Sequence, residues 1–139
     1  MKVEEFLFKE FEERIFLKPK LEKDPKKRMK QFIANLVNLT LERPMLYSIL
    51  RERAIFRKEF EKETLLKRKE LAEKTEEFLI QLKKEGVIDE EIDITVATFA
   101  LIGIINWIPL WFNPKGRINK DQLIDSISKF FIKGFFKKV

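Results

Sequence analysis

The sequence contains no cysteine and no histidine, and it has only four glycines among 139 residues. Without cysteine there are no disulfides and no thiolate nucleophiles, and without histidine the usual proton shuttle and many zinc sites are excluded. A serine–histidine triad is therefore impossible, and no glycine-rich phosphate loop or metal-spaced cluster is present. We predict a protein that is not an enzyme, with no catalytic residues, no bound metal and no cofactor.

Hydrophobic residues make up 45% of the chain and charged residues 37%. Few glycines and abundant lysine, glutamate, leucine and isoleucine favour helices. A chain of this length fits one domain whose core needs no disulfide or metal. We expect a single all-α domain over residues 1–139, without a signal peptide and therefore cytoplasmic.

The net charge of +6 is concentrated near the amino terminus. Seven basic residues lie between Lys18 and Lys30, and only Glu22 and Asp24 oppose them. Such a stretch suits contact with nucleic acid or another anionic partner. The alternative is a solvated loop together with the outer face of a helix start, and we favour that interpretation.

Apolar residues at helical spacing predict two helices in the first third of the chain. The first runs from Val3 to Ile15. The second begins at Asp24, because an N-cap followed by Pro25 is a strong start signal, and Pro44 ends it near Glu42. Its predicted core face comprises Met29, Phe32, Ile33, Leu36, Val37 and Thr40.

Two further helices are predicted in the middle of the chain. A short one covers Met45 to about Ala54, and a long, charged one runs from about Phe56 to Glu85 and stops at Gly86. The acidic cluster from Asp89 to Asp93 has the ligand type that a hard cation prefers. It lacks the spacing of a calcium loop and precedes an apolar helix, so we interpret it as capping.

The segment from Ile94 to Phe112 is apolar almost all the way round. Its length would permit a membrane span, but Asn106 and Pro109 lie inside it and the other helices have polar faces. We therefore predict a soluble helix that is buried on nearly all sides, partly by a second subunit. At Pro109 two interpretations stay open, a kink that shapes a cavity and a bend tolerated in core packing.

A turn at residues 113–116 separates this helix from the last one, which Asn119 caps together with Gln122. The predicted apolar stripe of the last helix comprises Leu123, Ile124, Ile127, Phe130, Phe131, Gly134 and Phe135. The two helices together, residues 94–136, form the predicted dimerisation hairpin.

The stretch INWIPLWFNPKGRINKDQLIDSISKFFIKGF resembles the carboxyl end of TetR-type transcriptional regulators, and LERPMLYSILRE and LKKEGVID are similar to interior segments of that family. The resemblance covers about Glu4 to Phe136. It implies an all-α ligand-binding and dimerisation domain of about six helices, with residues 1–17 as the connecting helix. It also implies a homodimer in which the last two helices of each subunit form a four-helix bundle.

The resemblance further implies two groups of site residues. A small, largely apolar effector would contact Phe32, Leu36, Tyr47, Leu50, Phe56, Phe78, Asn106, Trp107 and Trp111. The subunit interface would contain Ile102, Ile105, Leu123, Ile127, Phe130, Phe131 and Gly134. Ordinary core packing is the alternative for each of the effector residues.

The sequence departs from the family at its amino terminus, where the helix-turn-helix head is absent. We expect either a fragment or a headless relative, which would contact DNA only through the missing head and would not bind membranes. The first functional hypothesis is the effector-sensing body of a transcriptional regulator. The second is a stand-alone helical module that forms mixed dimers with a complete regulator.

Overall fold

The computed structural model describes residues 13–17, 19, 22–53 and 57–138. These residues form a short π-helical turn and four α-helices, and in this part of the chain no strand occurs beyond one isolated bridge. The elements are η1 (Glu13–Leu17), α3 (Pro25–Arg53), α4 (Arg57–Lys84), α5 (Ile94–Trp111) and α6 (Lys120–Phe135). The predicted all-α class is therefore confirmed.

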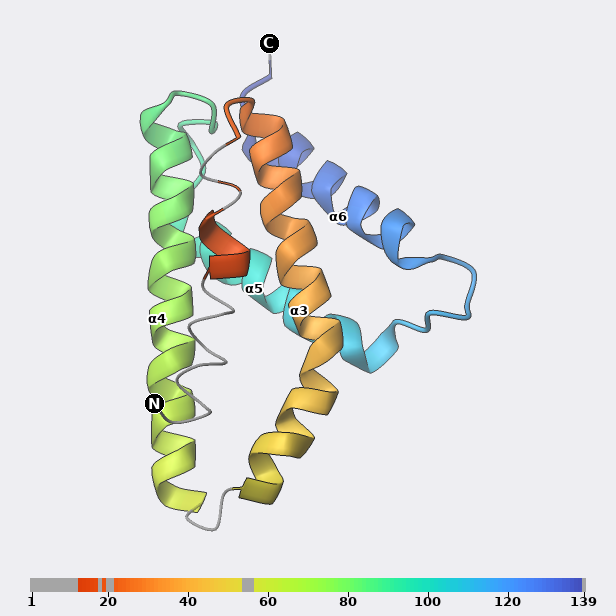
Figure 1. Cartoon of the computed structure of the whole chain (residues 1–139). Helices are drawn as coiled ribbons and strands as arrows, with labels where there is room; N and C mark the ends of the chain where they lie inside the picture. The colour runs from red at the N-terminus through yellow and green to blue at the C-terminus, as the bar shows by residue number, and fades with distance from the viewer. Residues whose placement is uncertain (1–12, 18, 20–21, 54–56, 139) are drawn as a thin grey trace.

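The prediction that Pro44 separates two helices is wrong, because α3 continues through it to Arg53. A proline inside a helix removes the N–H that would bond to the carbonyl of Thr40, but it does not have to end the helix. Figure 1 shows that the axis of α3 changes direction in its second half. Of the helix predicted from Val3 to Ile15, all but the last three residues lie outside the described part of the chain.

Local capping explains where the helices begin. The Asp24 carboxylate accepts a hydrogen bond of 3.0 Å from the backbone N–H of Lys26, beside Pro25 in the first turn of α3. Asp93 accepts one of 2.9 Å from the N–H of Val96 at the start of α5. The acidic cluster before α5 therefore contributes a cap, as predicted, which satisfies one donor that the helix leaves unpaired.

The end of α4 is a left-handed glycine turn. Gly86 has a φ of 77°, its N–H bonds to the carbonyl of Lys83, and the N–H of Val87 bonds to that of Leu82. This pattern closes a helix by satisfying its last carbonyls, and it favours glycine because a Cβ strains a positive φ. The predicted stop at Gly86 is confirmed.

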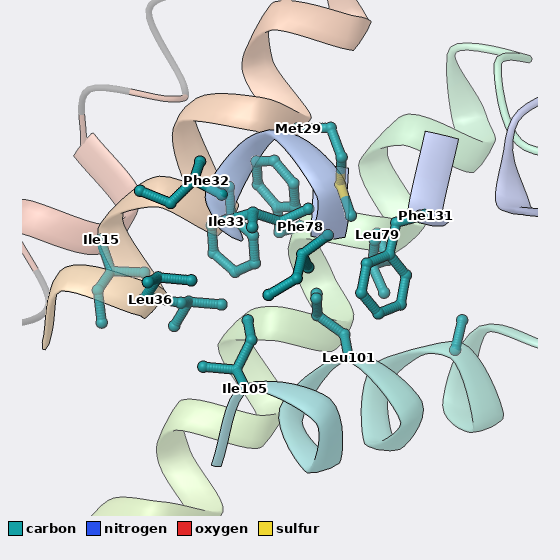
Figure 2. Close-up of a cluster of buried hydrophobic side chains, with 14 of the residues drawn as sticks. Ile15, Met29, Phe32, Ile33, Leu36, Phe78, Leu79, Leu101, Ile105 and Phe131 are labelled. Atoms are coloured by element: carbon teal, nitrogen blue, oxygen red, sulfur yellow. The ribbon is translucent and has the colours of Figure 1, made fainter. Parts of the chain in front are cut away.

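The core lies where α3 packs against η1, α5 and α6, and where α4 packs against α5. All six residues of the predicted core face of α3 are buried. Figure 2 shows Leu101 and Ile105 of α5 pointing toward the side chains of α3 and α4. The helical spacing therefore identified the core face of α3 correctly.

The end of α6 and the residues that follow it are hydrogen-bonded to the connection between α4 and α5. Ile88 and Phe136 form an isolated antiparallel bridge, in which the N–H of Asp89 donates to Phe135 and that of Lys137 donates to Val87, at 2.7 and 2.9 Å. In Figure 1, α3 crosses in front of α5, and the end of α6 lies near the top of α4. In this arrangement α3 covers only one side of α5.

Candidate functional site

The α5 helix has one buried face and one exposed face, although both are apolar. The buried residues are Ile94, Ala97, Thr98, Leu101, Ile105 and Ile108. The opposite face, which we call the open face of α5, contains Val96, Phe99, Ala100, Gly103, Ile104, Trp107, Leu110 and Trp111. Because the core needs only one side of this helix, a row of large apolar side chains is left in contact with water.

The exposure of this face is large for a water-soluble protein. Phe99 is 58% exposed, Trp107 63% and Trp111 50%. The three exposed rings of α5 present roughly 350 Å² of apolar surface, since an aromatic side chain buries ~150–250 Å². Phe130 of α6 is exposed as well. The largest apolar patch of a typical monomer is about 300–600 Å² and is often functional, and a stable interface buries ~800 Å² on each partner. The open face therefore has the properties of an interaction surface.

Two neighbouring phenylalanines of α6 illustrate how the surface and the core are divided. Phe130 is 77% exposed, whereas Phe131 is 3% exposed and its ring lies 4.8 Å from that of Phe135. Consecutive residues of a helix point about 100° apart, so one ring reaches the core while the next reaches solvent. Ser126 and Gly134, one turn on either side of Phe130, are exposed as well.

The predicted interface residues occupy three different environments. Phe130 and Gly134 are exposed, and Ile102 is partly buried. The other four, Ile105, Leu123, Ile127 and Phe131, are buried among the helices of their own chain. Sequence reasoning did not select Val96, Phe99, Ile104 and Leu110, because a helix that is apolar on all sides does not reveal which side the core covers.

The predicted effector residues do not gather in one place. Phe32 and Phe78 stack at a ring distance of 4.2 Å and an angle of 15°, and Leu36 is buried beside them. Such close stacking leaves no room for a ligand between the two rings. The side chains of Tyr47 and Leu50, and the whole of Phe56, lie outside the described part of the structure.

The other three predicted effector residues are on the exposed side of α5. Asn106 is exposed, and Trp107 and Trp111 belong to the open face. The ring of Trp111 meets that of Phe112 edge-on at 6.2 Å. Pro109 lies within α5, which continues to Trp111 despite the missing N–H.

The charged residues near the start of α3 make contacts within the chain. Arg28 forms a two-pronged ion pair with Glu85, and it donates hydrogen bonds to the carbonyls of Glu22 and Lys23 at 2.9 and 3.2 Å. The hydrogen bonds from Arg28 lower the pKa of Glu85 below its usual value. Arg28 is thus used to join the segment before α3 to the end of α4.

Further along α3, Lys30 pairs with Asp125 of α6 at 3.3 Å, and Lys129 pairs with the same carboxylate at 2.9 Å. The hydrogen bonds from Lys129 and Lys30 lower the pKa of Asp125. Lys23, Lys26 and Lys27 are exposed, whereas Lys18 and Lys20 lie outside the described residues. The described part of the basic stretch therefore contains solvated lysines, as the favoured interpretation predicts, and also two ion pairs, which that interpretation did not predict.

By length and composition, α5 is the one helix of the described residues that could cross a membrane, and 33% of it is buried. A helix placed between a core and a partner subunit has the same composition. The described residues contain no group of three or more acidic side chains that could hold a metal ion.

Comparison with known proteins gives a consistent result. The family model of tetracyclin repressor-like C-terminal domains matches residues 22–135. No curated protein matches the chain by sequence. The fold is similar to that of AibR in complex with isovaleryl coenzyme A and operator DNA, with a TM-score of 0.69 and 24% identity over 91% of this chain and 69% of that one.

Two further crystal structures share the fold. A transcriptional regulator of the TetR/AcrR family from Thermobifida fusca YX-ER1 has a TM-score of 0.69 and 22% identity, over 94% of this chain and 69% of its own. Apo AibR has a TM-score of 0.65 and 22% identity, over 91% and 67%. In each case about a third of the other chain has no counterpart among the 139 residues.

Proposed function

The chain belongs to the family of tetracyclin repressor-like C-terminal domains, and from this premise we propose that it is the effector-sensing and dimerisation domain of a transcriptional regulator. Operator recognition is assigned in this proposal to a part of the regulator outside these 139 residues. The regulator would act in the cytoplasm. The observation that carries the proposal is the open face of α5, which is apolar, aromatic and uncovered within one chain.

The proposed dimer places the open face of α5 and Phe130 of α6 against the same surface of a second copy. A two-fold interface uses one patch twice, so a single apolar face is sufficient to close the assembly. Aromatic residues are enriched in such contacts, and Trp107 is 63% exposed on this face. The proposal thus assigns Trp107 and Trp111 to the subunit contact, in place of the effector site that was expected from the sequence.

Effector binding is proposed for the part of α3 and α4 beyond the Phe32–Phe78 pair. Thr40 on α3 and Thr75 on α4 are among the buried residues, and the side chains of residues 43–68 lie outside the described part of the structure. The backbones of both helices continue for several turns beyond these points. Tyr47, Leu50 and Phe56 belong to this region of the sequence and remain the predicted ligand contacts.

The dimer is tested by light scattering of the wild type and of two variants with the same change of charge. We expect a particle of twice the 16.8 kDa chain mass. Trp107→Glu places a carboxylate in the open face and should weaken association by about 2 kcal/mol or more, as for a central interface tryptophan. Gln81→Glu makes an equivalent change on the exposed side of α4 and should leave the dimer intact. A monomeric wild type would refute this part of the proposal.

Effector sensing is tested by thermal unfolding with isovaleryl coenzyme A, the ligand named for AibR. A ligand that binds only the folded protein stabilises it by about 2.7 kcal/mol at a hundred times its Kd. Coenzyme A without the acyl chain and free isovalerate are the matched controls that separate the polar and apolar parts. A panel of small apolar compounds follows, and a dimer that none of these ligands stabilises would refute the sensing role.

A further inference from the structure

One of the four glycines, Gly103, lies in a helix interior where no contact among the described residues requires it. Gly86 is required by its positive φ, and a Cβ at Gly116 would lie 3.1 Å from the carbonyl oxygen of Asn113. Gly103 and Gly134 are both helical, Gly134 in the last turn of α6, and among the described residues a Cβ at either position would meet no atom within 4 Å beyond the backbone of its own helix. Glycine destabilises a helix interior relative to alanine, so its presence at Gly103 lowers the stability of α5, and no contact among the described residues offsets that loss.

Gly103 lies in the middle of the open face of α5, within a row of alternating size. Phe99 is one turn before it and Trp107 one turn after it, and both are more than half exposed. Residues four apart form a ridge along the surface of a helix. On this helix the ridge therefore consists of a large side chain, a glycine and a second large side chain, which leaves a gap at its centre.

The exposed side of α6 carries the complementary row. Phe130 is 77% exposed, and Ser126 and Gly134 are the exposed small residues one turn before and after it. This ridge consists of a small residue, a large side chain and a second small residue at the same spacing of four residues. Because both rows are symmetric about their central residue, they fit each other whether the two helices run parallel or antiparallel.

We infer that the Phe130 ring of one subunit packs into the gap above Gly103 of the other, and that Phe99 and Trp107 then lie against Ser126 and Gly134. The inference rests on the proposed dimer and specifies its register. The contact occurs twice, since a two-fold axis requires each subunit to supply both the ring and the gap. Phe130 of the same chain does not fill the gap, because no described side chain lies within 4 Å of a Cβ at Gly103.

The first test uses the absence of cysteine from the chain. Gly103→Cys and Phe130→Cys are purified separately, unfolded together, refolded and oxidised. A disulfide requires the two Cβ atoms to lie about 3.5–4.5 Å apart, so it reports close approach. We expect a covalent dimer in the mixture and in neither variant alone. A mixture of Phe130→Cys with Glu73→Cys, on the exposed side of α4, is the control and should not crosslink.

The second test uses a substitution that should stabilise the helix within one chain and weaken the association of two chains. Gly103→Leu should raise the helicity of α5, because leucine is the better helix former, while filling the gap weakens the dimer about tenfold or more. Adding Phe130→Ala removes the ring that clashes and should restore part of the lost affinity. Circular dichroism confirms folding, and light scattering measures association.

The outcomes separate the register from the proposed function. A wild-type dimer whose mixed cysteine variants do not crosslink, or in which Gly103→Leu and Phe130→Ala weaken association additively, would overturn the pairing alone. Gly103→Cys that crosslinks to itself would place the two-fold axis at α5 and would overturn it also. A wild-type monomer would instead overturn the dimer on which the pairing rests.

Discussion

Phe130 and Phe131 provide a matched pair of substitutions for dividing the core from the subunit surface. Phe131 is buried in the core, so Phe131→Ala should lower the free energy of unfolding by about 3–5 kcal/mol, the cost of truncating a core phenylalanine. The corresponding fall in melting temperature is about 10–17 °C for a chain of this size. Phe130 is 77% exposed, so Phe130→Ala should change the stability of one chain by no more than about 0.5 kcal/mol.

The two substitutions should differ in how their effects depend on protein concentration. Association stabilises the folded state by mass action, so a weakened dimer loses stability chiefly at high concentration. We expect the Phe131 variant to have a lower free energy of unfolding in urea than the wild type at all protein concentrations. The Phe130 variant should have a lower value only at concentrations at which the wild type is dimeric. Equal losses for both variants at low concentration would show that Phe130 is not a surface residue, and would refute the division of α6 into two faces.

Three further predictions concern contacts within one chain. Arg28→Met should lower the free energy of unfolding by about 1–2 kcal/mol, since it removes a charged hydrogen-bond network, and the contribution of Glu85 should disappear as the pH falls. The folded-state pKa of Glu85 is depressed, so its stabilisation is present above the unfolded pKa near 4.5 and is lost as the pH drops through the lower folded value. Asn119→Ala removes the cap of α6 and should cost about 1 kcal/mol in urea unfolding. Gly86→Ala should cost about 1–2 kcal/mol by the same measurement, because alanine must adopt the left-handed conformation.

Each of these predictions has a control that isolates its cause. Glu85→Gln should show less loss of stability on acidification than the wild type, and an unchanged pH profile would mean that the pair contributes nothing. Asn119→Asp keeps an acceptor for the N–H of Gln122, at 2.8 Å in the native cap, and should remain near wild type. Gly86→Asn should cost less than the alanine substitution, since asparagine tolerates positive φ better; the reverse order would contradict the role of the turn.

Much of the local structure was predictable because its causes lie within a few residues. Asp24 with Pro25, Asn119 with Gln122, and Gly86 each act on the backbone beside them, and the helix boundaries followed from these signals. The capping box at Asn119 is complete, with hydrogen bonds of 2.8 and 2.9 Å. Pro44 was the exception, because its effect depends on whether neighbouring turns hold the helix together.

The candidate site was less predictable for a physical reason. The effector list combined buried Phe32 and Phe78 with exposed Trp107 and Trp111, because aromatic character alone does not distinguish a core from a surface. Likewise, the predicted interface residues include four that are buried in the core and two, Phe130 and Gly134, that are exposed on α6. Only the direction in which each side chain points separates these groups, and that direction is set by the packing of other helices.

The sequence by itself determined that the chain is helical, where most of its helices start and stop, which face of α3 is buried, and to which family it belongs. Only the tertiary structure decided which side of α5 faces the core. When all sides of a helix are apolar, its sequence does not determine which side is buried. The buried side of α5 is the one against which α3 and α4 pack. The side they leave uncovered is the open face, with Gly103 at its centre.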